Sequence, residues 1–114
     1  MLLDVRVQFE RMLTAAMEAI EYAAQTQTLQ EWQSNKLVRR AVERCLINLG
    51  EEAASLRKLT SDSFDDVPLK EIAGFRHRLV HDYLRIDDSL VFEIIRDDCP
   101  AIIIAIQNIL DTHP

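Results

Sequence analysis

The sequence predicts an all-α fold: an antiparallel bundle of four or five helices, forming a single domain over residues 1–114. The chain has 114 residues, the size of one ordinary domain. It has only 2 glycines and 3 prolines, which leaves few of the sharp turns that a many-stranded sheet requires. Its apolar residues recur at steps of three and four, the period of one helix face, and no segment alternates like a strand.

The first expected helix carries one apolar stripe and ends in the polar stretch 25–28. Its stripe consists of Val5, Phe9, Met12, Leu13, Ala16, Ile20 and Ala23. Thr28 and Glu31 have the spacing of a capping box, so a short second helix is expected to begin there. Trp32 is predicted to be its apolar anchor.

The third expected helix begins at Ser34 or Asn35 and has the strongest stripe in the chain. The stripe consists of Leu37, Val38, Ala41, Val42, Cys45, Leu49, Ala53 and Leu56. Gly50 lies inside this pattern, where a glycine costs about 1 kcal/mol relative to alanine. We therefore expect Gly50 to mark a point where two helices pack closely.

A polar loop is expected from Thr60 to Asp66, and Pro68 fits the first turn of a fourth helix. That helix is expected to fade between Tyr83 and Ile86. Its predicted apolar positions are Ile72, Phe75, Leu79 and Val80.

The last helix is expected to begin at Asp87, Asp88 or Ser89. Pro100 should kink or divide it, because proline cannot donate a backbone hydrogen bond. The segment 101–110 is apolar nearly all round, which predicts burial on more than one side. This segment is expected to be either a central core helix or a dimer contact.

The net charge of −6 argues against a protein that coats nucleic acid by bulk electrostatics. Asp4 and Arg6 interrupt the start of the chain, so no secretory signal is expected. The longest apolar run, 101–106, is too short to span a bilayer. A cytoplasmic protein without a membrane partner is therefore expected. Two cysteines, Cys45 and Cys99, do not make a disulfide framework.

A basic segment, residues 70–85, holds two of the three histidines. It has four basic and two acidic residues, a balance of +2, whereas residues 87–98 have five acidic residues and one basic, a balance of −4. The segment therefore favours an anionic substrate. Phosphodiester transesterification of RNA fits its residue types: histidine transfers protons near neutral pH, arginine stabilises phosphate charge, and tyrosine binds phosphate or stacks on a base.

The same segment contains a competing metal pattern, because His77 and His81 are four residues apart and share a helix face. The metalloprotease pattern requires glutamate directly after the first histidine, and this chain has Arg78 there. Neighbouring arginines also disfavour a cation, so no metal or other cofactor is expected. His77, Arg78 and Arg85 are instead expected to bind substrate.

The run from Arg76 to Tyr83 reads R-x-x-x-x-H-x-Y and resembles the signature of the ribonucleases of the HEPN superfamily, in the form found in HepT-like toxins. Further similarity to that branch lies in residues 41–44, 49–53, 67–74, 79–83 and 94–100. The resemblance therefore spans nearly the whole chain. One departure is His77, which stands where the family commonly has a polar amide.

The resemblance implies a HEPN-like helical homodimer that cleaves RNA without metal. Arg76 would stabilise the phosphate, His81 would be the acid–base residue and Tyr83 the third catalytic member. It also implies a nucleotidyltransferase antitoxin that transfers AMP to Tyr83. Arg76 and His81 lie roughly 140° apart on an ideal helix, which favours a site combining two protomers. The alternative function is a non-catalytic module that binds a nucleotidyltransferase or a nucleotide.

Overall fold

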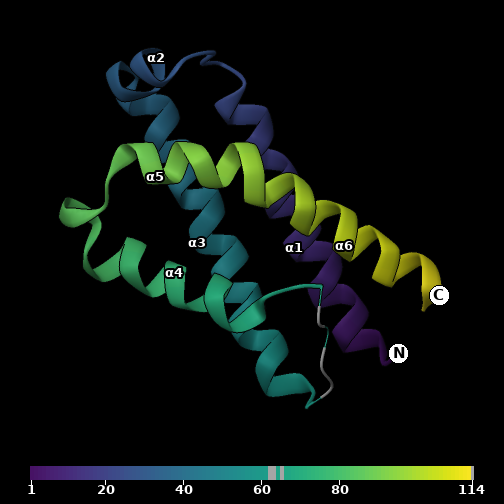
Figure 1. The fold of residues 1–114 in the computed structure, drawn as a ribbon. Coiled ribbons are helices and arrows are strands. Elements are labelled where there is room, and N and C mark those ends of the chain that lie inside the picture. Colours follow the sequence, from purple (N-terminus) through teal and green to yellow (C-terminus); the bar gives the residue numbers. More distant parts are fainter. Residues whose placement is uncertain (62–63, 65, 114) are drawn as a thin grey trace.

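The computed structural model describes residues 1–61, 64 and 66–113, which are helical throughout most of their length and contain no strand (Figure 1). The all-α prediction is confirmed. The elements, in chain order, are α1 (Leu3–Ala23), α2 (Leu29–Ser34), α3 (Lys36–Leu59), α4 (Leu69–His81), the 3₁₀ turn η1 (Tyr83–Arg85), α5 (Asp88–Glu93), the π-helical turn η2 (Ile94–Asp98) and α6 (Cys99–Thr112). Residues 62, 63 and 65 of the expected polar loop lie outside the described residues.

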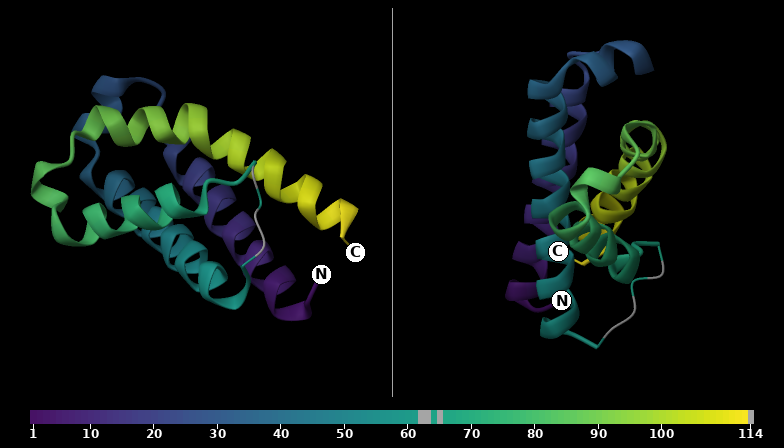
Figure 2. Two further views of the ribbon diagram at one scale, coloured as in Figure 1. Left: turned by 60° about the horizontal axis from the view of Figure 1, so that its bottom comes forward. Right: turned by 90° about the vertical axis from the view of Figure 1, so that its left-hand side faces the viewer.

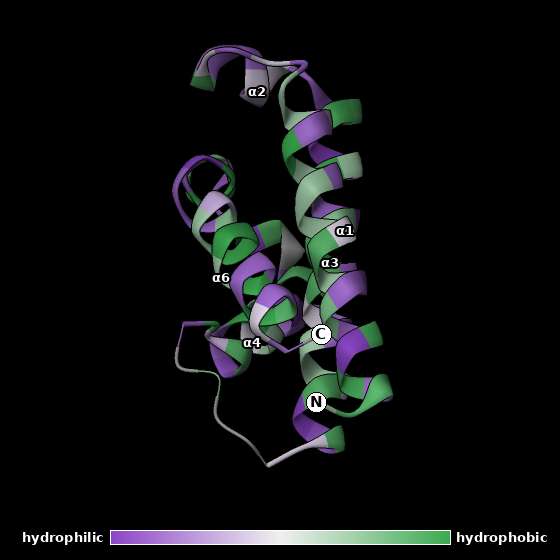
Figure 3. Cartoon of the chain, turned by 90° about the vertical axis from the view of Figure 1, so that its right-hand side faces the viewer, coloured by the Kyte–Doolittle hydropathy of each residue, from purple (hydrophilic) through white to green (hydrophobic). Residues whose placement is uncertain are grey.

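The helices form two layers. The antiparallel pair α1 and α3 makes one layer, and α4 with the α5–α6 arm makes the other (Figure 2). Figure 3, which views the molecule from another side, shows the same division, with α1 and α3 opposite α4 and α6. The two layers contact each other through two helix pairs: α4 packs on α3, and α6 packs on α1. No helix among the described residues is long and apolar enough to cross a membrane.

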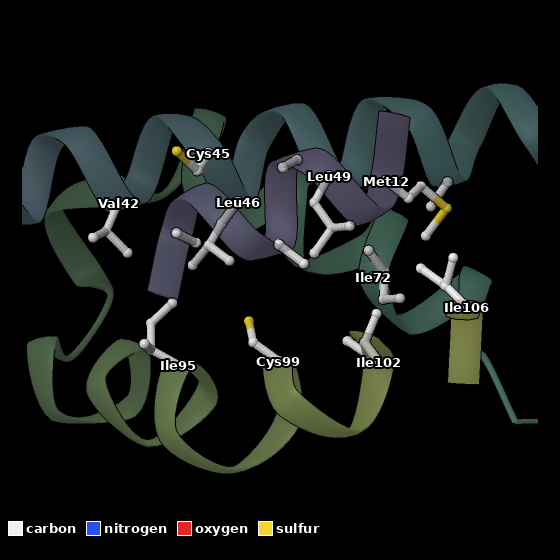
Figure 4. Close-up of a cluster of buried hydrophobic side chains, with 14 of the residues drawn as sticks. Met12, Val42, Cys45, Leu46, Leu49, Ile72, Ile95, Cys99, Ile102 and Ile106 are labelled. Atoms are coloured by element: carbon white, nitrogen blue, oxygen red, sulfur yellow. The ribbon is translucent and has the colours of Figure 1, made fainter. Parts of the chain in front are cut away.

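The core lies between the layers, where Leu46 and Leu49 of α3 meet Ile72 of α4 and Ile102 of α6 (Figure 4). Cys99 is fully buried in this core, and the burial raises the pKa of its thiol to about 12. The predicted stripes supply most of the core, with two errors: Leu37 and Val80 are 81% and 41% exposed. Val38 and Leu79 face the core, and the 100° step between adjacent helical residues turns Leu37 and Val80 toward the solvent.

The predicted starts of α2 and α3 are confirmed by their caps, whereas Pro68 stands just before the first turn of α4 and not within it. The Thr28 hydroxyl accepts a hydrogen bond from the Glu31 N–H at 3.1 Å, and the Glu31 carboxylate accepts one from the Gln27 N–H at 2.6 Å. Of the two candidates for the start of α3, Asn35 is the cap: its side chain accepts the Val38 N–H at 3.1 Å. Trp32 anchors α2 with no exposed surface.

Pro100 divides the last helix as predicted. Before it, the Cys99 N–H donates to the carbonyl of Ile94, five residues earlier, and this π turn places the proline in the first turn of α6. Of the two alternatives for residues 101–110, a central core helix is excluded because Ile104 is 60% exposed, and a dimer contact stays a prediction. One face of α6 is therefore open in a single chain, and its exposed residues include Ala101, Ile104, Gln107 and Asn108.

Candidate active site

The site residues named above lie at the end of α4 and in the turn that follows it. This turn is at the opposite end of the molecule from the two termini (Figure 1). Helix α4 ends at His81, where the N–H of Asp82 donates to the Arg78 carbonyl at 2.8 Å, and η1 follows. The predicted fading of the helix near Tyr83 is confirmed.

Arg76 lies on the side of α4 that faces α3, against Gly50. A Cβ atom built on Gly50 would overlap the Cβ of Arg76 and would come within 3.0 Å of its Cγ and 3.1 Å of the Ile72 carbonyl oxygen. The predicted close helix packing at Gly50 is confirmed. The arginine that the sequence singled out is thus the residue that occupies the space left by the glycine.

Among the described residues, no acidic side chain neutralises the guanidinium of Arg76. Its Nε atom is buried without a hydrogen-bond acceptor. Its two terminal nitrogens are not among the buried atoms that lack a partner. Over the ranges 1–61 and 66–113 no carboxylate pairs with it. Three other arginines pair with acidic side chains: Arg6 with Glu10 at 3.2 Å, Arg39 with Asp88 at 3.7 Å and Arg40 with Glu43 at 2.9 Å. Arg76 therefore keeps its charge available for an anion.

His77 and His81 lie one turn apart on the exposed side of α4. Their ring centroids are 4.4 Å apart with an interplanar angle of 44°. The pair offers two imidazoles, whereas protein zinc sites use three or four ligands. The described part of the chain contains no group of three metal-ligating side chains. The arrangement is suited to proton transfer at an open surface.

Arg78 and Arg85 are both exposed near these histidines. The guanidinium of Arg78 lies 6.0 Å from the centre of the Phe75 ring, at the limit of a cation–π contact. The backbone of Tyr83 begins η1, but its side chain lies outside the described residues.

The structure brings His77 and His81 together but does not bring Arg76 to His81. Arg76 faces α3, and His81 lies about 140° away around a regular helix. A single chain therefore presents the fixed charge and the proton carrier on two different sides of α4.

A network that the sequence did not reveal fixes the far side of the turn. The indole N–H of Trp32 donates to the Asp88 carbonyl at 2.9 Å, and Arg39 lies 3.7 Å from the Asp88 carboxylate. Arg39 also donates to the Trp32 carbonyl at 3.1 Å. Asp87 caps α5, and the hydrogen bonds from the backbone and the hydroxyl of Ser89 lower the pKa of its carboxyl group. The one feature of the sequence that points to this network is a lone tryptophan, Trp32, in a polar stretch.

A pocket of about 500 Å³ opens between α3, α4 and the α5–α6 arm, away from these residues. Its walls are mainly apolar, with Asp66, Glu71 and Asp98 among the lining side chains and no lysine, arginine or histidine. Phosphate binding is therefore better supported on the surface of α4 than in this pocket.

A family model described as "HepT-like: Ribonuclease HepT-like" matches residues 12–109. The chain belongs to this family. It is 33% identical over 99 residues to "Putative RNase MJ1380" of Methanocaldococcus jannaschii, covering 87% of this chain and 90% of that protein. It is 29% identical over 83 residues to "Putative RNase TTE0752" of Caldanaerobacter subterraneus, covering 73% and 74% respectively. No solved structure is a significant match.

Proposed function

We propose that this protein is a metal-independent endoribonuclease in which Arg76, His81 and Tyr83 carry the chemistry. The observation that supports this best is the state of Arg76, whose Cβ and Cγ pack against α3, whose Nε is buried, and whose guanidinium has no carboxylate partner among the described residues. A preorganised, un-neutralised cation is what stabilises charge that develops on a transferring phosphate. Membership in a ribonuclease family supports RNA as the polymer.

In the proposed reaction the ribose 2′-oxygen attacks the adjacent phosphorus. The 2′-O–P bond forms and the P–O5′ bond breaks, which gives a 2′,3′-cyclic phosphate and a 5′-hydroxyl. His81 transfers protons between the 2′-hydroxyl and the leaving 5′-oxygen, and Arg76 stabilises the phosphate. Tyr83 contacts the phosphate or a base, and His77, Arg78 and Arg85 hold the neighbouring RNA.

The proposed active form is a homodimer. His81 and Ile104 are both exposed, each on the side of its helix opposite the buried residues. A second copy related by a two-fold axis, if it packs on the exposed sides of both helices, would bury Ile104 and bring each His81 toward the partner. One cleft would then combine residues that a single chain keeps apart.

We also propose that the protein is the toxin of a toxin–antitoxin pair. Its antitoxin would be a nucleotidyltransferase that transfers AMP from ATP to the Tyr83 phenol oxygen, with release of pyrophosphate. The added phosphate would satisfy Arg76 from within and repel RNA. The position of Tyr83 in a short turn after α4 supports this proposal.

The activity is tested by incubating purified protein with RNA in excess chelator and determining the chemistry of the product ends. We expect cleavage to persist and to yield 2′,3′-cyclic phosphate ends, and we expect an all-DNA oligonucleotide of the same sequence to stay intact. His81→Ala, purified in parallel, controls for contaminating nuclease. Cleavage that stops on chelation would contradict the metal-independent mechanism, and RNA binding without any cleavage would favour a non-catalytic module.

The regulation is tested by mass spectrometry of protein coexpressed with a nucleotidyltransferase encoded beside it. We expect adducts with the mass of AMP on Tyr83, together with loss of RNA cleavage. Tyr83→Phe is the matched control, because it removes only the acceptor oxygen. Full inhibition of a protein with unmodified Tyr83 would mean that the partner acts by occlusion.

A further inference from the structure

We propose that Gly50 is a positioning residue: by lacking a side chain it allows the stem of Arg76 to rest on the backbone of α3, which fixes where the arginine presents its charge. This inference rests on the proposed function, because it takes Arg76 to be the group that contacts the phosphate. Gly50 itself touches no substrate in this proposal.

The contact between the two helices supports this role. The nearest atoms to a Cβ on Gly50 would be the Cβ and Cγ of Arg76, followed by the Ile72 carbonyl oxygen one turn earlier. Two of these three atoms belong to the arginine stem, and the third to the α4 backbone. Neither the Cβ nor the carbonyl can rotate away, so any side chain at position 50 would have to move α4 or displace Arg76.

The burial of Arg76 points the same way. Its Nε atom is covered and has no acceptor, so no hydrogen bond within the described residues holds the guanidinium in place. Packing of the stem is then the interaction that orients it. Burying an N–H without an acceptor is unfavourable. A buried Nε of this kind is consistent with a guanidinium whose terminal nitrogens bind an external anion.

The second glycine of the chain provides an internal comparison. Gly74 lies on α4, on its exposed side, and a Cβ built there would meet no atom within 4 Å. Both glycines are helical and both lower helix propensity by about 1 kcal/mol relative to alanine. Only Gly50 has a steric reason to lack a side chain, and that reason is Arg76.

The experiment measures how a 2′-O-methyl oligonucleotide, which cannot be cleaved, binds to the full-length protein over a series of KCl concentrations. Each phosphate contact made by a cation contributes about 0.7 to the slope of log K against log salt for a single strand. We expect Gly50→Ala to lower this slope by about 0.7, as Arg76→Ala does. We also expect it to slow RNA cleavage by roughly 10²-fold, the effect of a misplacement of about 1 Å.

Two control variants separate positioning from stability. Gly74→Ala should raise the Tm by a few degrees through helix propensity and leave the slope and the cleavage rate unchanged. Ala53→Gly, at a fully buried position one turn along α3 from Gly50, should lower the Tm and also leave the slope unchanged below the transition. A slope that falls as much in Ala53→Gly as in Gly50→Ala would overturn the positioning role.

The outcomes distinguish this inference from the proposed function. A slope unchanged in Arg76→Ala would contradict the phosphate contact itself. A slope lowered in Arg76→Ala but not in Gly50→Ala would overturn the role of Gly50 alone. If Gly50→Ala does not fold, the double variant Gly50→Ala/Arg76→Gly removes the overlapping Cβ: recovery of its helical circular dichroism supports the contact, and failure to recover overturns it.

Discussion

The two sides of α4 differ in how tightly they hold the side chains of the candidate site. On the inner side, Arg76 lies against Gly50 of α3 and its Nε is buried. On the outer side, His77 and His81 are exposed and have each other as ring neighbours at 4.4 Å. A single helix of 13 residues thus carries one packed group and one open pair.

This difference matches what the two kinds of group must do. A cation that stabilises a transition state acts best when its position is set before the reaction, because no energy is then spent on reorganisation. A proton carrier must reach atoms of the substrate and exchange protons with water, which requires exposure. The inner side of α4 offers the first condition and the outer side the second, so the proposed mechanism places the complete site across two protomers.

The largest expected effect tests the outer side. His81→Ala should slow RNA cleavage by about 10²–10⁴-fold, because it removes proton transfer. His77→Ala, one turn away on the same side, should slow it by less than about tenfold, the scale of one hydrogen bond. Single-turnover cleavage rates measure both. Equal losses would mean that the two histidines act together as acid and base. Tyr83 would then not be the third catalytic residue.

The next effect tests the inner side. Arg76→Ala should slow cleavage by about 10²–10³-fold through loss of the fixed charge. Arg78→Ala is the matched control on the same helix: its guanidinium is exposed, so its loss should cost no more than about fivefold. Circular dichroism and the Tm of both variants should stay close to wild type. A folded Arg76→Ala protein with full activity would remove the inner side from the mechanism.

The contrast between the two sides could be predicted only in part from the sequence. The 3.6-residue period places Arg76 and His81 on different sides and His77 beside His81, because these relations are local to one helix. The caps are also local: the sequence predicts Thr28, and it includes Asn35 and Asp87 among the two and three candidates for their helices. Gly50 signalled a close contact but could not name Arg76 as its partner.

What the sequence could not supply are the pairings between distant segments. The bond from Trp32 to Asp88 joins residues 56 apart in the chain, and no periodicity relates them. The exposure of Leu37 and Val80 has a similar origin. A stripe predicts which residues can face a neighbour, but the number of neighbours sets how wide the buried stripe becomes. Because α4 packs mainly on α3, its buried stripe is narrow.

A third expected effect tests whether a second copy covers the outer side. Ile104→Glu replaces an apolar side chain that is 60% exposed in one chain, so the free energy of unfolding of the monomer should change by no more than about 0.5 kcal/mol. If a second copy buries Ile104, the dimer dissociation constant should rise at least about tenfold. Light scattering across a dilution series measures this. A wild-type protein that is monomeric at micromolar concentration would contradict the proposed dimer.

The smallest expected effect tests whether Arg76 of one protomer and His81 of the other share one cleft in the dimer. Arg76→Ala and His81→Ala proteins are each inactive in the proposed mechanism, and they are mixed under conditions that allow the subunits to exchange. If each cleft takes Arg76 from one chain and His81 from the other, a mixed dimer has one cleft with both residues intact and one with both removed. Random exchange makes about half of the dimers mixed, so activity should recover to about one quarter of wild type. If both residues act within one chain, every cleft keeps one defect and no activity returns. Mixing either variant with an Arg76→Ala/His81→Ala double variant is the control, because no combination in that mixture contains an intact cleft.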